Sequence, residues 1–343
     1  MNRIPLYPLR FEPIYQYRLW GGRRLANWLS APLPGDGPIG EAWVLSDRDD
    51  LPSRVANGPL KGRTIGQLIE QWPEQMLGEL SKRFHRFPLL LKFLDARDVL
   101  SVQVHPSDRQ TDYLPAGEHG KTEAWVVLEA GPESIIYAGL KPATKSMYMD
   151  KTMYMVQADD LRRAIAYGTV ADHLADFRPK PGDGVFLQAG TVHAMGDVVV
   201  FEVQENSDVT FRLYDWDRVD AKTGKQRELQ VDQAMACIDL ARGAVGPVAP
   251  VVEEVQPVLR ERLFDCEHFG LWRLHGDSPF VVGAMDTPRV LVCIDGDGQL
   301  EHNGADYAIG KGDVALLPAV VGACAFRPRG AVTMFEISLP EGA

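Results

Sequence analysis

The sequence lacks the long apolar segments that would place it in or across a membrane. None of its hydrophobic runs approaches the roughly 18 consecutive apolar residues that a membrane-spanning helix needs. The opening stretch, MNRIPLYPLRF, has no apolar core of the kind found in a secretory signal peptide. We therefore expect a protein that neither spans a membrane nor carries a secretion signal.

Cysteine is scarce as well. The four cysteines, Cys237, Cys266, Cys293 and Cys324, lie far apart and form no pair at the spacing of a metal site. Isolated cysteines of this kind are typical of small buried side chains in a reducing compartment. The sequence therefore predicts free thiols and a cytoplasmic location.

Positive charge is also in short supply. The 36 lysines and arginines stand against 47 aspartates and glutamates, which gives a formal net charge of −11. Nucleic acids and anionic membranes both need clustered positive charge on the protein, so we expect neither as a partner. An anionic small molecule would have to be bound by a few local basic groups, for which Lys92, Lys121 and Arg212 are candidates.

The chain does have the length and composition of a soluble protein with a large core. Its 343 residues suffice for two domains, and 45% of them are hydrophobic. Short alternating runs bounded by Gly and Pro predict a mainly β fold. Helices are expected over 63–80, with a break at Pro73, and over 159–168, 169–177 and 229–241. A linker is expected over 242–257, which is rich in Gly, Pro, Ala and Val.

His105, Glu123 and His193 are of the residue types that hold a divalent metal with an open coordination position. In the expected strand 101–105, Gln103 and His105 lie on one face and two valines lie on the other. The same alternation places Glu123 and Arg212 on the polar faces of their strands. If these strands line one small barrel, the polar faces converge in its mouth, a usual place for a ligand site. We therefore predict a metal site of two histidines and one glutamate, which suits zinc.

The segment before His193 resembles the second motif of the cupin superfamily. Gly182 is followed after five residues by Gln188-Ala189-Gly190-Thr191-Val192-His193, with Gln188 in place of the usual proline. The first cupin motif is altered here. Gln103 stands where cupins usually have a histidine, and Glu123 lies eighteen residues beyond His105.

Several further motifs recur in a fixed order along the chain. They are Gln103-Val104-His105-Pro106, Lys121-Thr122-Glu123, Ala189-Gly190-Thr191-Val192-His193, and the run 202–212 with Glu202, Gln204, Ser207, Asp208 and Arg212 at set spacing. The runs Trp20-Gly21-Gly22, Gly40-Glu41-Ala42-Trp43 and Leu316-Leu317-Pro318-Ala319 add to the pattern. This series resembles the class I (type I) mannose-6-phosphate isomerases, which are zinc phosphomannose isomerases, in their short bacterial form. The resemblance covers nearly the whole chain.

The resemblance implies a domain organisation. We expect a mainly β protein of two cupin (jelly-roll β-barrel) domains with a helical insertion, at about 144–178, in the first. The N-terminal domain, 1–250, would be catalytic and would contain the metal site. The C-terminal domain, 258–343, would be a degenerate cupin, because its run 318–323 has no histidine at the ligand position.

The resemblance also implies an activity. Such a protein would interconvert D-mannose 6-phosphate and D-fructose 6-phosphate through an enediol, with one Zn²⁺ per chain, as a monomer or homodimer. Gln103 is implied as a fourth metal ligand beside His105, Glu123 and His193. The catalytic arginine of the family maps onto Arg212, whose guanidinium keeps its proton and is therefore expected to act electrostatically.

The identity of the general base stays open between two residues. Glu202 lies in an apolar strand, where burial raises the pKa of a carboxylate toward a useful range. A desolvated Lys121 is the competing base, although it could equally bind the sugar phosphate. Lys92 and Asp208 complete the expected substrate-binding set, Lys92 by reaching the phosphate and Asp208 mainly by orienting Arg212.

Three other functions are compatible with parts of this pattern. A non-catalytic metal-binding sugar sensor of the same fold would be expected to have lost Arg212 or a metal ligand. The present sequence has lost neither. An iron-dependent cupin oxygenase could use the same ligands, but the Lys-Thr-Glu and Ser-Asp-x-x-x-Arg motifs have no evident purpose in oxygen chemistry. An isomerase acting on a different aldose would carry almost the same site.

Overall fold

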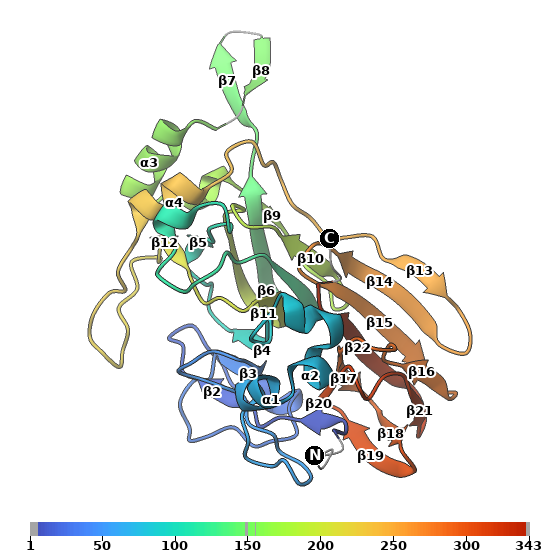
Figure 1. Ribbon diagram of the computed structural model, residues 1–343. Coiled ribbons are helices and arrows are strands. Elements are labelled where there is room, and N and C mark those ends of the chain that lie inside the picture. The colour runs from blue at the N-terminus through green and yellow to red at the C-terminus, as the bar shows by residue number, and fades with distance from the viewer. Residues whose placement is uncertain (1–5, 148–149, 155, 341–343) are drawn as a thin grey trace.

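The computed structural model describes residues 6–147, 150–154 and 156–340 (Figure 1). Its largest sheet has nine strands and contains most of the sequence motifs. Along its main path the order is β10 (Gly184–Leu187), β6 (Glu123–Leu140), β11 (His193–Glu205), β4 (Leu89–Ala96), β3 (Glu41–Leu45) and β2 (Ile14–Gln16). Three shorter strands extend it: β5 (Val102–Val104), which pairs with β11 and with β12 (Phe211–Tyr214), and β9 (Leu174–Phe177), which pairs with β6.

The C-terminal part of the chain forms two more sheets. The seven-stranded sheet runs β1 (Leu9–Arg10), β20 (Val314–Leu317), β17 (Arg289–Asp295), β22 (Val332–Ser338), β15 (Gly270–Gly276), β14 (Leu259–Asp265) and β13 (Val251–Glu254). The four-stranded sheet runs β16 (Phe280–Val282), β21 (Cys324–Pro328), β18 (Asp297–His302) and β19 (Ala305–Gly310). Because β1 pairs with β20, the N-terminal segment extends a sheet that is otherwise C-terminal.

Helices are few and short. They are α1 (Ile65–Gln71), α2 (Pro73–Leu77), α3 (Ala158–Ala166) and α4 (Val231–Cys237), with 3₁₀ turns η1 (Arg24–Asn27), η2 (Gly78–Lys82), η3 (Thr111–Tyr113) and η4 (Val170–His173). The predicted break at Pro73 is confirmed, because this proline begins α2 directly after α1 has ended. Among the described residues, no helix is long and apolar enough to cross a membrane.

Two local predictions are wrong. The segment 169–177 is not one helix, because after η4 it continues as β9 and pairs with the long edge of β6. The expected linker 242–257 contains the strand β13, which pairs with β14. In both places a free strand edge offers backbone hydrogen bonds, and these outweigh a weak local preference.

The expected helical insertion at about 144–178 is only partly helical. It opens with a hairpin of β7 (Ala143–Met147) and β8 (Asp150–Tyr154), continues with α3 and η4, and returns to the large sheet through β9. Figure 1 shows the hairpin projecting away from the rest of the fold. Residues 148, 149 and 155 of this insertion lie outside the described part of the chain.

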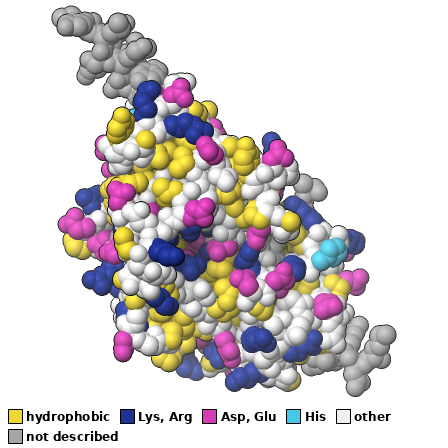
Figure 2. Space-filling view, turned by 90° about the vertical axis from the view of Figure 1, so that its left-hand side faces the viewer, with side chains coloured by type: hydrophobic (Ala, Val, Ile, Leu, Met, Phe, Trp, Pro, Cys, Tyr) yellow, Lys and Arg dark blue, Asp and Glu magenta, His cyan; other side chains and the backbone are white. Residues whose placement is uncertain are grey.

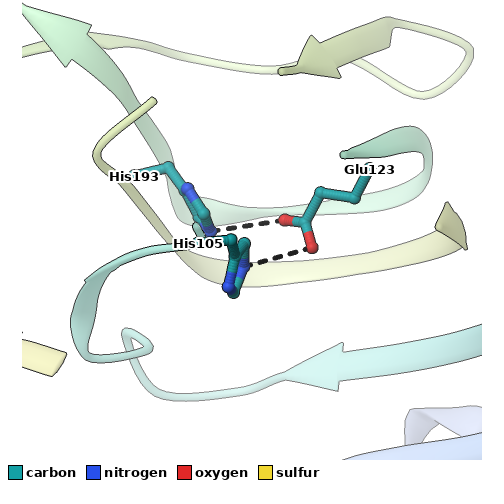
Figure 3. A group of neighbouring side chains, drawn as sticks. All are labelled: His105, Glu123 and His193. Atoms are coloured by element: carbon teal, nitrogen blue, oxygen red, sulfur yellow. Dashed lines mark ion pairs between the residues drawn. The ribbon is translucent and has the colours of Figure 1, made fainter. Parts of the chain in front are cut away.

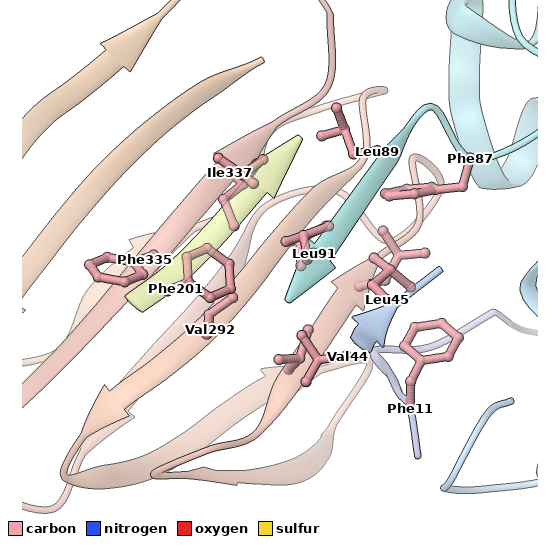
Figure 4. Packing of buried hydrophobic residues seen from close by; sticks show 14 of the residues in the cluster. Phe11, Val44, Leu45, Phe87, Leu89, Leu91, Phe201, Val292, Phe335 and Ile337 are labelled. Carbon is pink, nitrogen blue, oxygen red and sulfur yellow. The ribbon is translucent and has the colours of Figure 1, made fainter. Parts of the chain in front are cut away.

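The two large sheets pack face to face across one hydrophobic core. Leu91 of β4 and Phe201 of β11 point from the nine-stranded sheet toward Phe335 and Ile337 of β22 (Figure 4). The ring centroids of Phe201 and Phe335 are 5.5 Å apart. Since side chains alternate along a strand, the neighbours of these residues on β4 and β11 point to the opposite face of the nine-stranded sheet. That face carries the candidate site.

Candidate active site

The predicted metal ligands start or follow three neighbouring strands. Glu123 begins β6, His193 begins β11, and His105 follows β5 directly. The turn before His193 depends on Gly190, whose φ of 87° is unfavourable for a residue with a side chain. Gln103 of β5 lies opposite His193 on one side and opposite Arg212 of β12 on the other. Strand pairing therefore brings together motif residues that are more than 100 positions apart, such as Gln103 and Arg212.

The three side chains converge on one point (Figure 3). The Nε2 atoms of His105 and His193 each lie 3.3 Å from a different carboxylate oxygen of Glu123. One ligand atom from each residue falls within 4.8 Å of the others, and all three side chains are buried.

The hydrogen bonds behind the imidazoles fix their tautomers. Nδ1 of His105 lies 2.8 Å from the carbonyl oxygen of Val209, and Nδ1 of His193 lies 2.9 Å from that of Thr191. A carbonyl oxygen only accepts, so each Nδ1 carries the proton and each Nε2 presents a lone pair to Glu123. Nε2 of His105 is buried and has no hydrogen-bond partner among the described residues. The carboxylate of Glu123 faces both imidazoles, and its Oε2 also pairs with Nζ of Lys121. A cation placed among lone pairs that face one another in this way would be stabilised, and the donor set fits a divalent metal.

The electrostatics of the three ligands favour their metal-binding forms. Burial and the nearby charge of Lys121 lower the pKa of His105 to about 3, and burial lowers that of His193. Burial alone would raise the pKa of Glu123, but Lys121 and the two imidazoles hold it well below its usual value. Neutral imidazoles and an ionised carboxylate are the forms that bind metals.

Gln103 lies beside this cluster, with its amide nitrogen 3.2 Å from Nε2 of His193. Its amide oxygen accepts a hydrogen bond from the Ser101 hydroxyl. To serve as a fourth ligand through oxygen, the amide would have to turn by about half a revolution, a change that exchanges two atoms of similar size.

Lys121 is held against the metal-ligand set by an ion pair. Its Nζ lies 2.9 Å from Oε2 of Glu123, and the side chain is buried. Burial opposes a buried ammonium, but the carboxylates of Glu123 and Glu202 outweigh it and raise the pKa of Lys121 above its usual value.

A row of four side chains crosses the sheet next to the cluster. Trp43 of β3 pairs in register with Lys92 of β4, Lys92 with Glu202 of β11, and Glu202 with Trp125 of β6. Each of these side chains is at most 2% exposed. Burial of a lysine and a glutamate in an apolar sheet costs desolvation free energy, which must be offset by pairing of their charges. Such residues are often retained because they have a function.

Lys92 is surrounded by carboxylates rather than facing open solvent. Its Nζ lies 3.4 Å from Asp208, 3.6 Å from Glu202 and 3.9 Å from Glu41. Asp208, expected to orient Arg212, has its ion pair with Lys92, and no ion pair with Arg212 is found among the described residues.

Glu202 combines burial with an unused oxygen. Its Oε2 accepts a hydrogen bond of 2.7 Å from the Trp125 indole, whereas its Oε1 has no hydrogen-bond partner. Burial, followed by the negative charge of Glu123, raises the pKa of Glu202 to about 7. A carboxylate with that pKa can exchange a proton at neutral pH.

A cavity of about 340 Å³ opens over this row. It is lined mostly by polar and charged side chains, which include Gln103, Lys121, Lys92, Glu202, Asp208 and Arg212 from the predicted set. Arg212 is half-buried, and its Nε has no partner. Burial and the nearby Arg227 lower the pKa of Arg212 from its usual value. No ion pair of Arg212 is found in the described part of the chain, so its charge is free to meet an anion.

Other residues of the cavity were missed from the sequence. They are Tyr17, Arg18, Trp20, Glu41, Trp125, Asp220 and Arg227. One of them could have been found from the sequence. Glu41 is the only charged residue of the strand Glu41–Leu45, which indicates a buried polar group. Arg18 and Arg227 lie in loops, where no periodicity marks a residue for one face.

A second group of metal-ligating residue types lies elsewhere. Asp108, Glu205 and His268 have ligand atoms within 4.8 Å of one another. Nδ1 of His268 lies 3.1 Å from a carboxylate oxygen of Glu205, and Glu205 also accepts a hydrogen bond from the backbone of Thr122. The proximity of these side chains is therefore explained by the ion pair between His268 and Glu205, and no metal is needed to account for it.

The molecular surface mixes charges of both signs. On the face shown in Figure 2, Lys and Arg side chains are interspersed with Asp and Glu. Among the described residues on this face there is no continuous basic surface of the kind that nucleic-acid binding requires. The four cysteines are free, as predicted.

Comparison with known proteins decides the family. Residues 9–123 match the family model for the catalytic domain of type I phosphomannose isomerase. The mannose-6-phosphate isomerase ManA of Bacillus subtilis is 35% identical over 321 residues, which are 92% of this chain and 94% of the relative. The mannose-6-phosphate isomerase of Streptococcus mutans is 32% identical over 92% of this chain and 93% of its own length.

The chain belongs to the mannose-6-phosphate isomerase family. The family predicted from the motifs is thus confirmed, and the chain is an enzyme of an isomerase family.

Its fold is also that of a mannose-6-phosphate isomerase. The crystal structure of the Bacillus subtilis enzyme matches with a TM-score of 0.86 at 27% identity, covering 97% of this chain and all of that one. The prediction of a mainly β, cupin-type fold is confirmed.

Proposed function

We propose that this protein interconverts D-mannose 6-phosphate and D-fructose 6-phosphate with one bound Zn²⁺. The observation that carries the proposal is a buried His105–Glu123–His193 cluster beside a cavity lined by Glu202 and Arg212. Glu202 has an oxygen without a hydrogen bond, and Arg212 has no ion pair among the described residues. Relatives that align with 92% of the chain are named mannose-6-phosphate isomerases. The cavity is mainly polar, as binding of a sugar phosphate requires.

We propose that His105, Glu123 and His193 hold the metal, with Gln103 as a fourth ligand after rotation of its amide. When bound, a divalent metal supplies a positive charge that polarises the oxygens of the sugar. The two backbone carbonyls behind the imidazoles keep the ligating nitrogens aimed at the site.

Glu202 is the residue best placed to move the proton. Its Oε1 would take the proton from C2 of the open-chain aldose, and the electrons of that bond would form the C1–C2 double bond while the pair of the C1 carbonyl bond moves to O1, which gives an enediolate. A proton would pass from O2 to O1. The electrons left on O2 would then form the C2 carbonyl, and the pair of the C1–C2 double bond would take the proton back from Glu202 at C1. Lys121 is less suited as a base, because its ammonium donates to Glu123.

The cationic residues have distinct roles in this proposal. Arg212 stabilises the negative charge that develops on the enediolate, because it is the cation of the cavity with no ion pair among the described residues. Lys121 is proposed to bind the substrate while paired with Glu123. Lys92 and Asp208, which pair with each other, are proposed to hold the substrate at the other side of Glu202. Arg18 and Arg227 add positive charge for the phosphate at the cavity wall.

The wider assignments accompany this proposal. The catalytic part is proposed to be 1–250, with 258–343 as the degenerate second domain, and the protein is proposed to act in the cytoplasm as a monomer or homodimer.

The proposal is tested by measuring conversion of mannose 6-phosphate to fructose 6-phosphate by the purified protein. Activity should disappear after chelation and return with Zn²⁺. A folded, metal-loaded protein that leaves mannose 6-phosphate unchanged would contradict the proposal, and the same assay with other aldoses would then separate a different substrate from a sensor without activity.

Replacement of Arg212 by alanine should lower kcat by about 10²- to 10³-fold, the usual cost of losing one group that stabilises transition-state charge. Metal content and melting temperature should stay at wild-type values, because Arg212 contacts none of the three metal ligands in the described structure. Arg162→Ala is a matched control, since Arg162 is exposed and pairs only with Asp232. Wild-type turnover in Arg212→Ala would exclude the electrostatic role.

A further inference from the structure

Trp125 and Glu41 lie on opposite sides of Glu202 and Lys92. Trp125 lies beyond Glu202 at one end of the cross-strand row, and Glu41 lies on β3 two residues before Trp43 at the other end. Both side chains line the cavity. Neither has a role in the function described above.

The Trp125 indole distinguishes the two oxygens of Glu202. Its N–H donates to Oε2 at 2.7 Å and leaves Oε1 without a hydrogen-bond partner. A carboxylate without such a donor could rotate and present either oxygen to the Lys92 amine, whose Nζ lies 3.6 Å from Oε1 in the observed orientation. The indole therefore holds Glu202 in one orientation.

Glu41 is fully occupied by protein donors. Its Oε1 accepts from Nε of Arg18 at 2.8 Å, and its Oε2 accepts from the same guanidinium at 3.0 Å and from the Trp43 indole at 2.7 Å. Burial would raise the pKa of Glu41, but Lys92 and Arg18 lower it to about 2, so it stays charged. A carboxylate bonded in this way has little capacity left for a sugar hydroxyl. Its remaining influence is on Lys92, whose Nζ is 3.9 Å away.

We propose that Trp125 and Glu41 are positioning residues for proton transfer: Trp125 fixes Oε2 of Glu202, and Glu41, clamped by Arg18, shares the Lys92 amine with Glu202. The amine then stays 3.6 Å from Oε1, beyond hydrogen-bond distance, and Oε1 can accept the substrate proton. The inference rests on the proposed role of Glu202. The charged groups around Glu202 are Lys92 from β4, Glu41 from β3, Glu123 from β6 and Lys121 from the loop before it. Trp125 is the one neutral side chain that fixes its orientation in the described structure.

The first test replaces Trp125 by phenylalanine, which keeps an aromatic ring and removes the N–H donor. We expect kcat to fall by about 10- to 100-fold, as for loss of one hydrogen bond to a charged group, with KM within about twofold of wild type. Metal content should not change. Trp28→Phe is the matched control, because the Trp28 indole also donates to a carboxylate, that of Glu129 at 2.6 Å, but lies outside the cavity. This variant should have wild-type kcat.

The second test replaces Glu41 by glutamine, which keeps the shape and removes the charge. The Lys92 amine should then move toward Oε1 of Glu202, and kcat should fall by about tenfold. Glu41 and Trp125 lie on different strands. If one of the two variants fails to fold, kinetics of the other variant still test the proposal.

Both variants are then combined with Glu202→Gln. If the two residues act through Glu202, neither should lower kcat further in that background, whereas a structural effect would persist. Wild-type kcat in both single variants, or equal losses with and without Glu202, would overturn the inference. Wild-type turnover of Glu202→Gln by itself would instead overturn the proposed base.

Discussion

Replacement of Glu202 by glutamine should lower kcat by about 10²- to 10⁴-fold, the usual contribution of a general base. Glutamine keeps the size of the side chain and can still accept from the Trp125 indole, but it cannot take a proton. Metal content and melting temperature should therefore remain close to wild type. Steady-state kinetics with mannose 6-phosphate, together with metal analysis, would measure the effect.

The same residue predicts the pH dependence of the wild-type enzyme. A base acts in its deprotonated form, and the pKa of Glu202 is raised to about 7. Turnover should thus fall as pH drops through about 7 and should level off above it. In Glu202→Gln the residual activity should show no such acid limb.

A matched control for this variant is Glu129→Gln. Glu129 also accepts from a tryptophan indole, that of Trp28, but it lies outside the cavity. It should keep wild-type turnover and the wild-type acid limb. If Glu202→Gln retained the acid limb as well, the base would have to be sought elsewhere in the cavity.

Replacement of His193 by alanine should abolish metal binding and turnover together. The imidazole is one of the three buried side chains proposed to bind the metal. Without it, the proposed site keeps His105, Glu123 and the uncharged amide of Gln103. This set should not hold a divalent metal tightly, so the metal content should fall from one per chain to near zero. Elemental analysis of the dialysed protein and the isomerase assay would measure the two losses.

His275→Ala provides the comparison for the His193 variant. His275 is exposed, and its imidazole contacts the hydroxyl of Thr333, far from the ligands in the fold. Metal content and turnover should be unchanged in this variant. Tight metal binding with full activity in His193→Ala would show that the buried cluster is not the metal site.

The structure changes the expected roles of the lysines. From the sequence, Lys92 in an apolar strand could only be assigned to packing or to the phosphate. In the fold it lies among Glu202 of β11, Asp208 of the loop after β11, and Glu41 of β3. No local pattern predicts that environment, because it depends on the pairing of β4 with both β3 and β11.

The sequence by itself determined the mainly β fold and the break at Pro73, and the resemblance of its ordered motifs to the mannose-6-phosphate isomerases determined the family. It also predicted three candidate metal ligands. The fold and these candidates follow from local features: alternation along strands, glycine before a turn, and residue types with metal-binding chemistry. Only the tertiary structure decided that 174–177 and 251–254 are strands, that Glu202 presents one free oxygen, and that Glu41 and Trp125 flank it. Those features depend on which strand edges are free and on which side chains lie opposite one another across the sheet. Such relations arise between segments that are distant in sequence, and a local pattern does not predict them.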